Sequence, residues 1–326
     1  MASFRRKLRH FRKGLVHALL ILPEIVVVRL GVWIIPRLSR RKILRLAHLL
    51  GGCAFRLSKR NNRHMRANLK LIYGDSQSEE ERRRFMRAVW NHAALVLLDC
   101  VWFLRNTSDR IKEHVEFDPS FRVLSDNKEG AVAVTAHVGN WEVAAHSVCQ
   151  VGRELSSVFA PIGATRLTQQ TLLSSRESNG QHLVARQGAV LHLLRALRNG
   201  QIIGLLLDQF NKVSQGGMFV NILGMPAPIS KIAGVLHHRR KCPVHILACI
   251  HTGNGHYRVF LFDTLPVSAD LSEENATRWV ANALSRLIRS YPEQWLWMYR
   301  RWRQIFPGDN PARYPYYSHF FNPLID

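Results

Sequence analysis

The sequence predicts an α/β fold in which helices cover a mixed or parallel sheet. Two short apolar runs, AVAVTA at 131–136 and IIGLLL at 202–207, have the composition of strands that are buried on both faces. Segments with apolar residues at helical spacing alternate with these runs, and such alternation is typical of α/β proteins. The chain has 326 residues, of which 47% are hydrophobic, so it is able to bury a sizeable core. This composition excludes a disordered, a collagen-like and a polytopic membrane protein.

The region before the first strand is predicted to be helical, with helices over 39–72 and 79–104. Ser78 followed by Glu81 has the spacing of a capping box, in which the two side chains satisfy backbone N–H groups at the start of a helix. Apolar residues then recur at intervals of three and four residues, which supports the second helix.

Strands and helices alternate in the second half of the chain. The predicted helices are 141–151, 188–199 and 273–290, and the predicted strands that follow the two apolar runs are 244–250 and 257–262. Gly200 directly after its helix is a typical stop signal. Large aromatic residues at alternate positions predict one more strand at 295–299. No internal repeat or low-complexity linker divides this region.

The positive charge is concentrated at the N-terminus. The chain holds 46 Lys and Arg against 23 Asp and Glu, a formal net charge of +23. Residues 1–70 contain 18 of these cations and a single acid, Glu24, and therefore account for +17. A surface of this kind meets an anionic partner: nucleic acid, acidic lipid or an acidic protein.

The N-terminal segment has the pattern of a membrane anchor. Residues 14–36 are mostly apolar, and basic clusters flank them at 5–13 and 37–45. Polar and charged residues interrupt the apolar run, so a helix that lies in or dips into the cytoplasmic leaflet, with its cations on anionic headgroups, fits better than a spanning helix. The alternative is a buried core helix with a solvated basic rim. We expect two parts, an anchor at 1–45 and a single α/β domain at 46–326.

The cysteines and histidines give no metal or disulfide pattern. The five cysteines form no C-x-x-C pair and lie in or beside apolar runs, which indicates buried, reduced thiols. The sixteen histidines include no H-E-x-x-H motif. We therefore expect neither a metal ion nor another cofactor.

His137 and Glu142 are the strongest candidates for chemistry. His137 stands at the carboxyl end of the first predicted strand, where ligands bind in open α/β sheets. Glu142 follows in the first turn of the next helix, where a carboxylate could hold one imidazole nitrogen while the other nitrogen faces a substrate hydroxyl. Taken alone, this spacing is a weak signal, because a single histidine near a strand end is more often a structural, hydrogen-bonded residue.

Four separated segments resemble one known family. They are RHMRANL at 63–69, HVGNWE at 137–142, DQFNKVSQGGMFVNILGMPAP at 208–228 and PEQWLWMYRRWR at 292–303. Together they resemble the late lipid A acyltransferases of bacteria, the lauroyl- and myristoyl-transferases of the lysophospholipid acyltransferase superfamily. The resemblance covers nearly the whole chain, except for 152–187, and implies a glycerolipid-acyltransferase-like fold with an N-terminal membrane-associated helix.

The resemblance also implies a reaction. His137 would act as the general base and Glu142 as its orienting carboxylate, in direct transfer of a fatty acyl chain from acyl-acyl carrier protein to a hydroxyl of a lipid A precursor. The enzyme would then serve lipopolysaccharide biosynthesis at the cytoplasmic face of the inner membrane, in contact with anionic lipids, its glycolipid acceptor and the acidic carrier protein.

Five further residues are expected to bind substrate. Arg176, Arg186 and the backbone near Asn140 offer donors for a tetrahedral oxyanion, and either arginine could instead hold a sugar phosphate. Asn140 is also suited to cap the helix that follows it. Asp208 and Gln209 end the second apolar strand at the same sheet edge, where Asp208 would have a structural or acceptor-positioning role.

Three alternatives stay open. The acceptor could be another glycolipid or a lysolipid, and the donor could be acyl-coenzyme A. From a different class, the chain could be a non-catalytic protein that binds a membrane surface or nucleic acid. Nucleic acid is not the expected partner, because the basic residues flank an apolar run and no nucleic-acid-binding module is recognisable.

Overall fold

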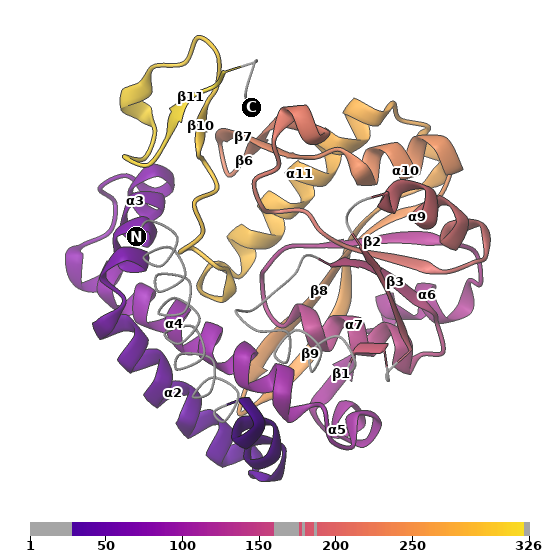
Figure 1. Ribbon diagram of the computed structural model, residues 1–326, viewed down its shortest axis with the longest axis horizontal. Helices are drawn as coiled ribbons and strands as arrows, with labels where there is room; N and C mark the ends of the chain where they lie inside the picture. The colour runs from indigo at the N-terminus through magenta and orange to yellow at the C-terminus, as the bar shows by residue number, and fades with distance from the viewer. Residues whose placement is uncertain (1–27, 160–175, 178–179, 186–187, 323–326) are drawn as a thin grey trace, which may run out of the picture.

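The computed structural model describes residues 28–159, 176–177, 180–185 and 188–322. Its centre is a seven-stranded sheet with the order β1-β9-β8-β2-β5-β3-β4 (Figure 1). The strands are β1 Val115–Phe117, β2 Ala131–Thr135, β3 Leu155–Phe159, β4 Gln181–Ala185, β5 Ile202–Leu206, β8 Val244–Gly253 and β9 His256–Leu265. Strands β4, β3, β5, β2 and β8 run parallel, while β9 is antiparallel to β8 and carries β1 parallel to itself. The predicted α/β class with a mixed sheet is confirmed.

Helices cover both faces of the sheet and create two hydrophobic cores. One core lies under α9 Ala189–Arg198, α10 Ile232–Arg240 and α11 Glu273–Ser290. The other lies under α5 Thr107–His114, α6 Arg122–Asp126 and α7 Trp141–Gln150. Alternate residues of β2 face the two cores, Ala131 and Ala133 on one side, Val132 and Val134 on the other, as a strand that is buried on both faces requires.

Three long helices precede the sheet: α2 Arg40–Leu57, α3 Lys59–Tyr73 and α4 Glu79–Trp102 (Figure 1). The single helix predicted over 39–72 is therefore wrong in one respect, because Ser58 leaves the helical conformation and separates α2 from α3. Helix α4 begins with the predicted capping box, in which Ser78 N donates to the Glu81 carboxylate over 2.8 Å and Glu81 N donates to Ser78 Oγ over 3.2 Å.

The remaining elements are short. They include the hairpin β6 Gly217–Ile222 with β7 Met225–Ser230, and the pair β10 Gln304–Ile305 with β11 His319–Phe320. Short 3₁₀ helices lie at Ile35–Arg37, Pro119–Phe121, Val213–Gln215, Val267–Ala269, Pro292–Gln294 and Pro311–Arg313.

The strand predicted at 295–299 is wrong. This segment forms only an isolated antiparallel bridge between Trp295 and Val138, and otherwise runs as turns. Trp295 and Trp297 are both fully buried, and their rings meet edge to face at 4.8 Å. The aromatic spacing thus reflects irregular chain that fills the core beneath residue 138, and not the two faces of a strand.

The predicted anchor lies mostly outside the described residues, which begin at 28. Residues 28–34 are helical, and Leu30 and Trp33 are exposed there. In the described part of the chain, no helix combines the length and the apolar character needed to cross a bilayer. Helix α2 runs through the expected boundary at residue 45, and Ile43 in its first turn belongs to the core of the α/β domain.

Candidate active site

His137 and Asp208 lie together at the carboxyl edge of the sheet. Each stands two residues beyond the end of its strand, β2 or β5, and these strands are neighbours in parallel register. The backbone N–H of Leu207 donates to the carbonyl oxygen of Thr135 over 3.1 Å and so keeps the two chains paired up to this point. This edge of an open α/β sheet is where ligand-binding residues gather.

A short hydrogen bond joins the two side chains. His137 Nδ1 lies 2.7 Å from Asp208 Oδ1. The other carboxylate oxygen, Oδ2, accepts hydrogen bonds from Trp295 Nε1 and from the Arg301 guanidinium, both at 2.8 Å. Burial by itself would raise the pKa of Asp208, but His137 and Arg301 outweigh it and hold that pKa well below its usual range. Asp208 is therefore a buried anion.

This contact defines the role of each imidazole nitrogen. With Asp208 ionised, Nδ1 carries the proton that is donated to the carboxylate, and Nε2 keeps its lone pair. Gln209 donates its side-chain N–H to Nε2 over 3.3 Å. The ring of Trp141 packs against the imidazole at 4.8 Å and restricts its orientation. Since the His137 side chain is 15% exposed, Nε2 is placed to accept a proton from a hydroxyl group that takes the position of the Gln209 amide.

Glu142 does not make the contact that was expected of it. No hydrogen bond or ion pair joins it to His137 among the described residues; its carboxylate instead pairs with Arg176, whose Nε lies 2.9 Å from Oε2. The carboxylate that orients His137 is thus Asp208, which was expected only to have a structural or acceptor-positioning role. Arg176, expected as an oxyanion donor, is engaged by Glu142. Arg186 lies outside the described residues.

Both members of the Glu142–Arg176 pair are largely buried, with side-chain exposures of 12% and 17%. Burial acts to lower the pKa of Arg176, yet the neighbouring carboxylate raises it above its ordinary value. Glu142 also stands in the first turn of α7, where the helix dipole favours a negative charge. The pair therefore connects the start of α7 to Arg176.

The loop that carries His137 is held by its backbone. Gly139 has φ +62°, and a side chain there would collide with the carbonyl oxygen of Cys249, so only glycine fits. Its N–H donates to the Gln294 carbonyl over 3.0 Å, and its carbonyl oxygen accepts from His92 Nε2 over 3.0 Å. Burial lowers the pKa of His92 to about 4, which keeps this donor neutral near pH 7.

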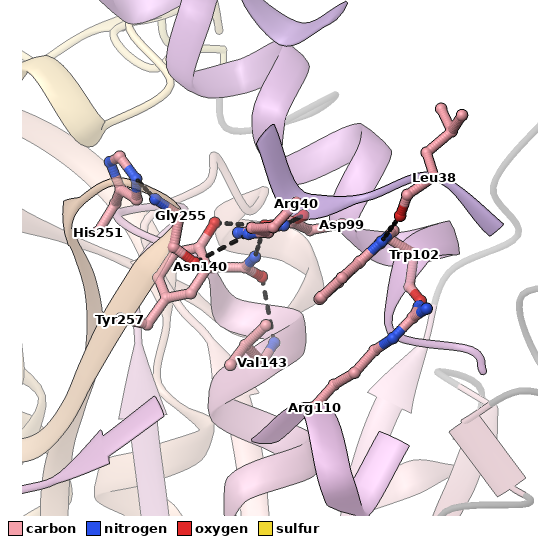
Figure 2. A network of polar contacts seen from close by, with 10 residues as sticks. All are labelled: Leu38, Arg40, Asp99, Trp102, Arg110, Asn140, Val143, His251, Gly255 and Tyr257. Carbon is pink, nitrogen blue, oxygen red and sulfur yellow. Dashed lines mark hydrogen bonds and ion pairs between the residues drawn. The ribbon is translucent and has the colours of Figure 1, made fainter. Parts of the chain in front are cut away.

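Asn140 caps α7 as predicted, because its side-chain oxygen accepts from Val143 N over 3.1 Å. Its side-chain nitrogen donates to the buried carboxylate of Asp99 over 3.4 Å. Figure 2 shows Asp99 between Asn140, Arg40 and Tyr257; Arg40 binds both carboxylate oxygens and the Tyr257 hydroxyl donates to one of them. The first residue of α2 is thereby connected through α4 and β9 to the residue that begins α7.

Sequence reasoning assigned no role to Asp99, Trp295 or Arg301. Trp295 and Arg301 lie within the segment 292–303 that carries part of the family resemblance, and this resemblance could have drawn attention to them. No sequence pattern indicated a role for Asp99, since a single acid in a helix is ordinarily solvated. No cluster of metal-ligating side chains occurs within the described ranges.

Comparison with known proteins identifies the family. A family model described as bacterial lipid A biosynthesis acyltransferase matches residues 2–304. The chain is also similar to the lipid A biosynthesis lauroyltransferase of Escherichia coli (strain K12), with 22% identity over 292 residues, which cover 86% of this chain and 92% of that protein. The family match spans the helices, the sheet and both segments that meet at Asp208. The chain therefore belongs to the bacterial lipid A biosynthesis acyltransferase family and is an acyltransferase of lipid A biosynthesis.

Proposed function

We propose that this acyltransferase is membrane-associated and moves a fatty acyl chain from acyl-acyl carrier protein to a hydroxyl of a lipid A precursor at the cytoplasmic face of the inner membrane. The observation that carries the chemistry is the 2.7 Å contact between His137 Nδ1 and the buried Asp208 carboxylate. It supports a general base that works on a substrate hydroxyl.

The proposed reaction has two steps. His137 Nε2 takes the proton of the acceptor hydroxyl while its oxygen attacks the thioester carbonyl carbon. The tetrahedral intermediate then collapses, the carbon–sulfur bond breaks, and the leaving thiolate takes the proton from the imidazolium. Asp208 stays ionised throughout and stabilises the imidazolium, as the carboxylate of a catalytic triad does.

The open end of α7 suits the tetrahedral oxyanion. The backbone N–H groups of Gly139, Asn140 and Val143 already donate within the protein. Those of Trp141 and Glu142 stand in the first turn of the helix, which has no intrahelical acceptor for them. Their partial positive charge, added to that of the helix dipole, would stabilise a negative oxygen at this point.

Membrane association draws its support from the outer face of α2. Leu49, Leu50 and Leu57 are exposed there at 63%, 41% and 79%. Basic residues of the same helix lie beside them, a combination that favours an interface with anionic lipid. Together with the basic, apolar N-terminal segment, this face would place the domain on the bilayer that holds the acceptor.

The test is transfer of a labelled acyl chain by the purified protein in mixed micelles that contain a lipid A precursor. We expect product from acyl-acyl carrier protein and none from His137→Ala, a loss on the order of a hundredfold to ten-thousandfold. Mass spectrometry of the product identifies the acylated hydroxyl. Transfer from acyl-coenzyme A alone would overturn the donor assignment, and transfer only to lysophospholipid would overturn the acceptor assignment.

A further inference from the structure

A groove with an unusual excess of arginine runs along α3. Three depressions adjoin α3. Two of them, of about 260 and 470 Å³, lie between α3 and the C-terminal chain and share Arg60, His64 and Arg300. The third, of about 500 Å³, is lined by residues of α2, α3 and α4 and shares Lys59 and Arg63 with its neighbour. The cations of the three depressions are Arg56, Lys59, Arg60, Arg63, Arg66, Arg83, Arg300 and Arg303. We call the three depressions together the basic trough. No Asp or Glu lines any of its three described parts, and the nearest carboxylate contact is the ion pair between Arg66 and Glu79 at its edge.

The trough has a fixed shape. Asn68 donates to the carbonyl oxygens of Trp297 and Tyr299 over 2.6 and 2.9 Å and so ties α3 to the opposite wall. Figure 1 shows α3 beside the C-terminal chain that carries β10 and β11. Arg63 lies 4.0 Å above the ring of Tyr316, which limits the directions that its guanidinium can take. The walls of the trough are thus packed elements, while five of its eight cations are exposed on them: Arg56, Lys59, Arg60, Arg63 and Arg83.

The two arginines that the C-terminal chain contributes have no protein anion beside them among the described residues. Arg300 and Arg303 are half-buried, yet neither has an ion-pair partner in the described part of the chain. The pKa of the neighbouring His64 is lowered by burial and by the positive charges of Arg300 and Arg60. Bringing several cations together in a partly desolvated channel is unfavourable unless an anion enters it.

At one end of the trough, Arg303 contacts the chain segment that leads to the active site. The guanidinium of Arg303 lies 5.0 Å from the ring of Phe210, the residue after Gln209, whose amide contacts His137. The other end lies where α2 meets α3, next to Leu57, which is 79% exposed. A ligand in the trough would therefore lie between the exposed Leu57 side of α2 and the segment that carries Gln209.

We propose that the basic trough is the subsite that binds the phosphate groups on the headgroup of the glycolipid acceptor and so delivers the acceptor hydroxyl to His137. The guanidinium group donates pairs of parallel hydrogen bonds that match a phosphate, and the trough is lined mainly by arginine. Its concave form suits small oxyanions on a sugar better than the convex surface of an acidic carrier protein. The inference rests on the proposed function only in taking the acceptor to be a glycolipid.

Binding is tested without activity by calorimetric titration of the full-length protein with inorganic pyrophosphate at constant ionic strength. The variant Arg63→Gln/Arg300→Gln removes one guanidinium from each wall. We expect its affinity for pyrophosphate to fall at least about tenfold, because each charge-assisted contact contributes that much. The matched control is Arg198→Gln/Arg240→Gln, which removes two exposed arginines from α9 and α10 and should bind as the unaltered protein does. No saturable binding, or an equal loss in the control, overturns the proposal.

Kinetics and vesicles then distinguish the sources of the anion. We expect the double variant of the trough to raise KM for a phosphorylated acceptor about tenfold or more and to leave KM for the acyl donor as it was. A rise in the donor KM instead would assign the trough to the carrier protein. Loss of binding to phosphatidylcholine vesicles that contain phosphatidylglycerol, without a change in acceptor KM, would assign it to bulk lipid headgroups. Each of these two results overturns the acceptor subsite, and pyrophosphate binding remains informative even if the acceptor is misassigned.

Discussion

Replacing Asp208 by asparagine keeps the size of the side chain and removes its charge. Three donors surround the carboxylate: His137 Nδ1 on one oxygen, and Trp295 and Arg301 on the other. An asparagine offers one oxygen and one NH₂ group, so one side must lose its acceptor. If the oxygen stays with Arg301 and Trp295, the amide N–H faces His137 Nδ1 and moves the imidazole proton to Nε2. The histidine is then unable to take a proton from the acceptor.

The structure sets the size of two separate effects. Loss of the base should lower kcat on the order of a hundredfold to ten-thousandfold, equivalent to about 2.7–5.4 kcal/mol in the barrier. The variant also leaves the Arg301 guanidinium, which is 1% exposed, without its buried anion. Breaking a buried pair in this way costs ~3–5 kcal/mol of folding free energy. The two effects are distinguishable, because only the first persists at a temperature where the variant is fully folded.

The assay is single-turnover acyl transfer by Asp208→Asn, His137→Ala and the double variant, each checked by circular dichroism for a folded state at the assay temperature. We expect the double variant to be no slower than His137→Ala, since residues that act as one unit give non-additive losses. Activity of Asp208→Asn within about fivefold of the unaltered enzyme would refute the reasoning. A second result would also refute it: additive losses when Asp208→Asn is combined with His137→Ala, together with non-additive losses when Glu142→Gln is combined with His137→Ala. That result would assign the orienting role to Glu142.

The other predictions concern the surroundings of the site. Glu142→Gln should leave Arg176 buried and unpaired, and lower the midpoint of thermal unfolding, while the proton-transfer limb of the pH–rate profile keeps its position. Tyr257→Phe should lower kcat only a few-fold and destabilise the fold by ~1 kcal/mol in urea titration, because it removes one hydrogen bond from Asp99. Deleting residues 1–36 should release the protein from membranes in a flotation assay; a truncated chain that still floats in high salt would place the attachment elsewhere. Burial lowers the pKa of His245 to about 4, so the unfolded chain binds its proton first as the pH falls from about 6.5. His245 should then lower the free energy of unfolding by up to ~1.4 kcal/mol per pH unit between about pH 6.5 and 4, in addition to the contribution of His92, and His245→Asn should reduce the total slope by that amount.

Local patterns were sufficient for much of the fold. The apolar runs at 131–136 and 202–207 predicted β2 and β5 because a strand that is buried on both faces needs no alternation. Strand β3 was not predicted, since its serines at 156 and 157 break the apolar pattern; there Ser156 is satisfied by Gln201 at 2.7 Å. The alternating aromatic residues at 295–299 led to a wrong prediction of a strand, because buried aromatic side chains occur in irregular segments as well as in strands.

Of the proposed catalytic pair, His137 and Asp208, only His137 was predicted in its role, and the reason is topological. His137 and Glu142 are close in sequence, so a motif brings them to attention. His137 and Asp208 are separated by 71 positions, and their contact depends on β2 lying directly beside β5. Neighbouring strands of a parallel sheet need not be consecutive, and here β3 and β4 lie beyond β5. Only knowledge of the strand order would therefore have identified Asp208, and not Glu142, as the carboxylate that contacts His137.

The two carboxylates differ in their charge balance as well as in their distance from His137. Each has its own guanidinium: Arg301 for Asp208 and Arg176 for Glu142. Glu142 and Arg176 contact each other, so a proton that arrives on His137 changes little at that pair. Asp208, in contrast, binds Arg301 through one oxygen and His137 through the other, and its negative charge is shared between them. In the proposed mechanism, the imidazolium that forms when the acceptor hydroxyl is deprotonated would therefore meet its compensating charge at 2.7 Å, on a carboxylate that Trp295 and Arg301 already orient.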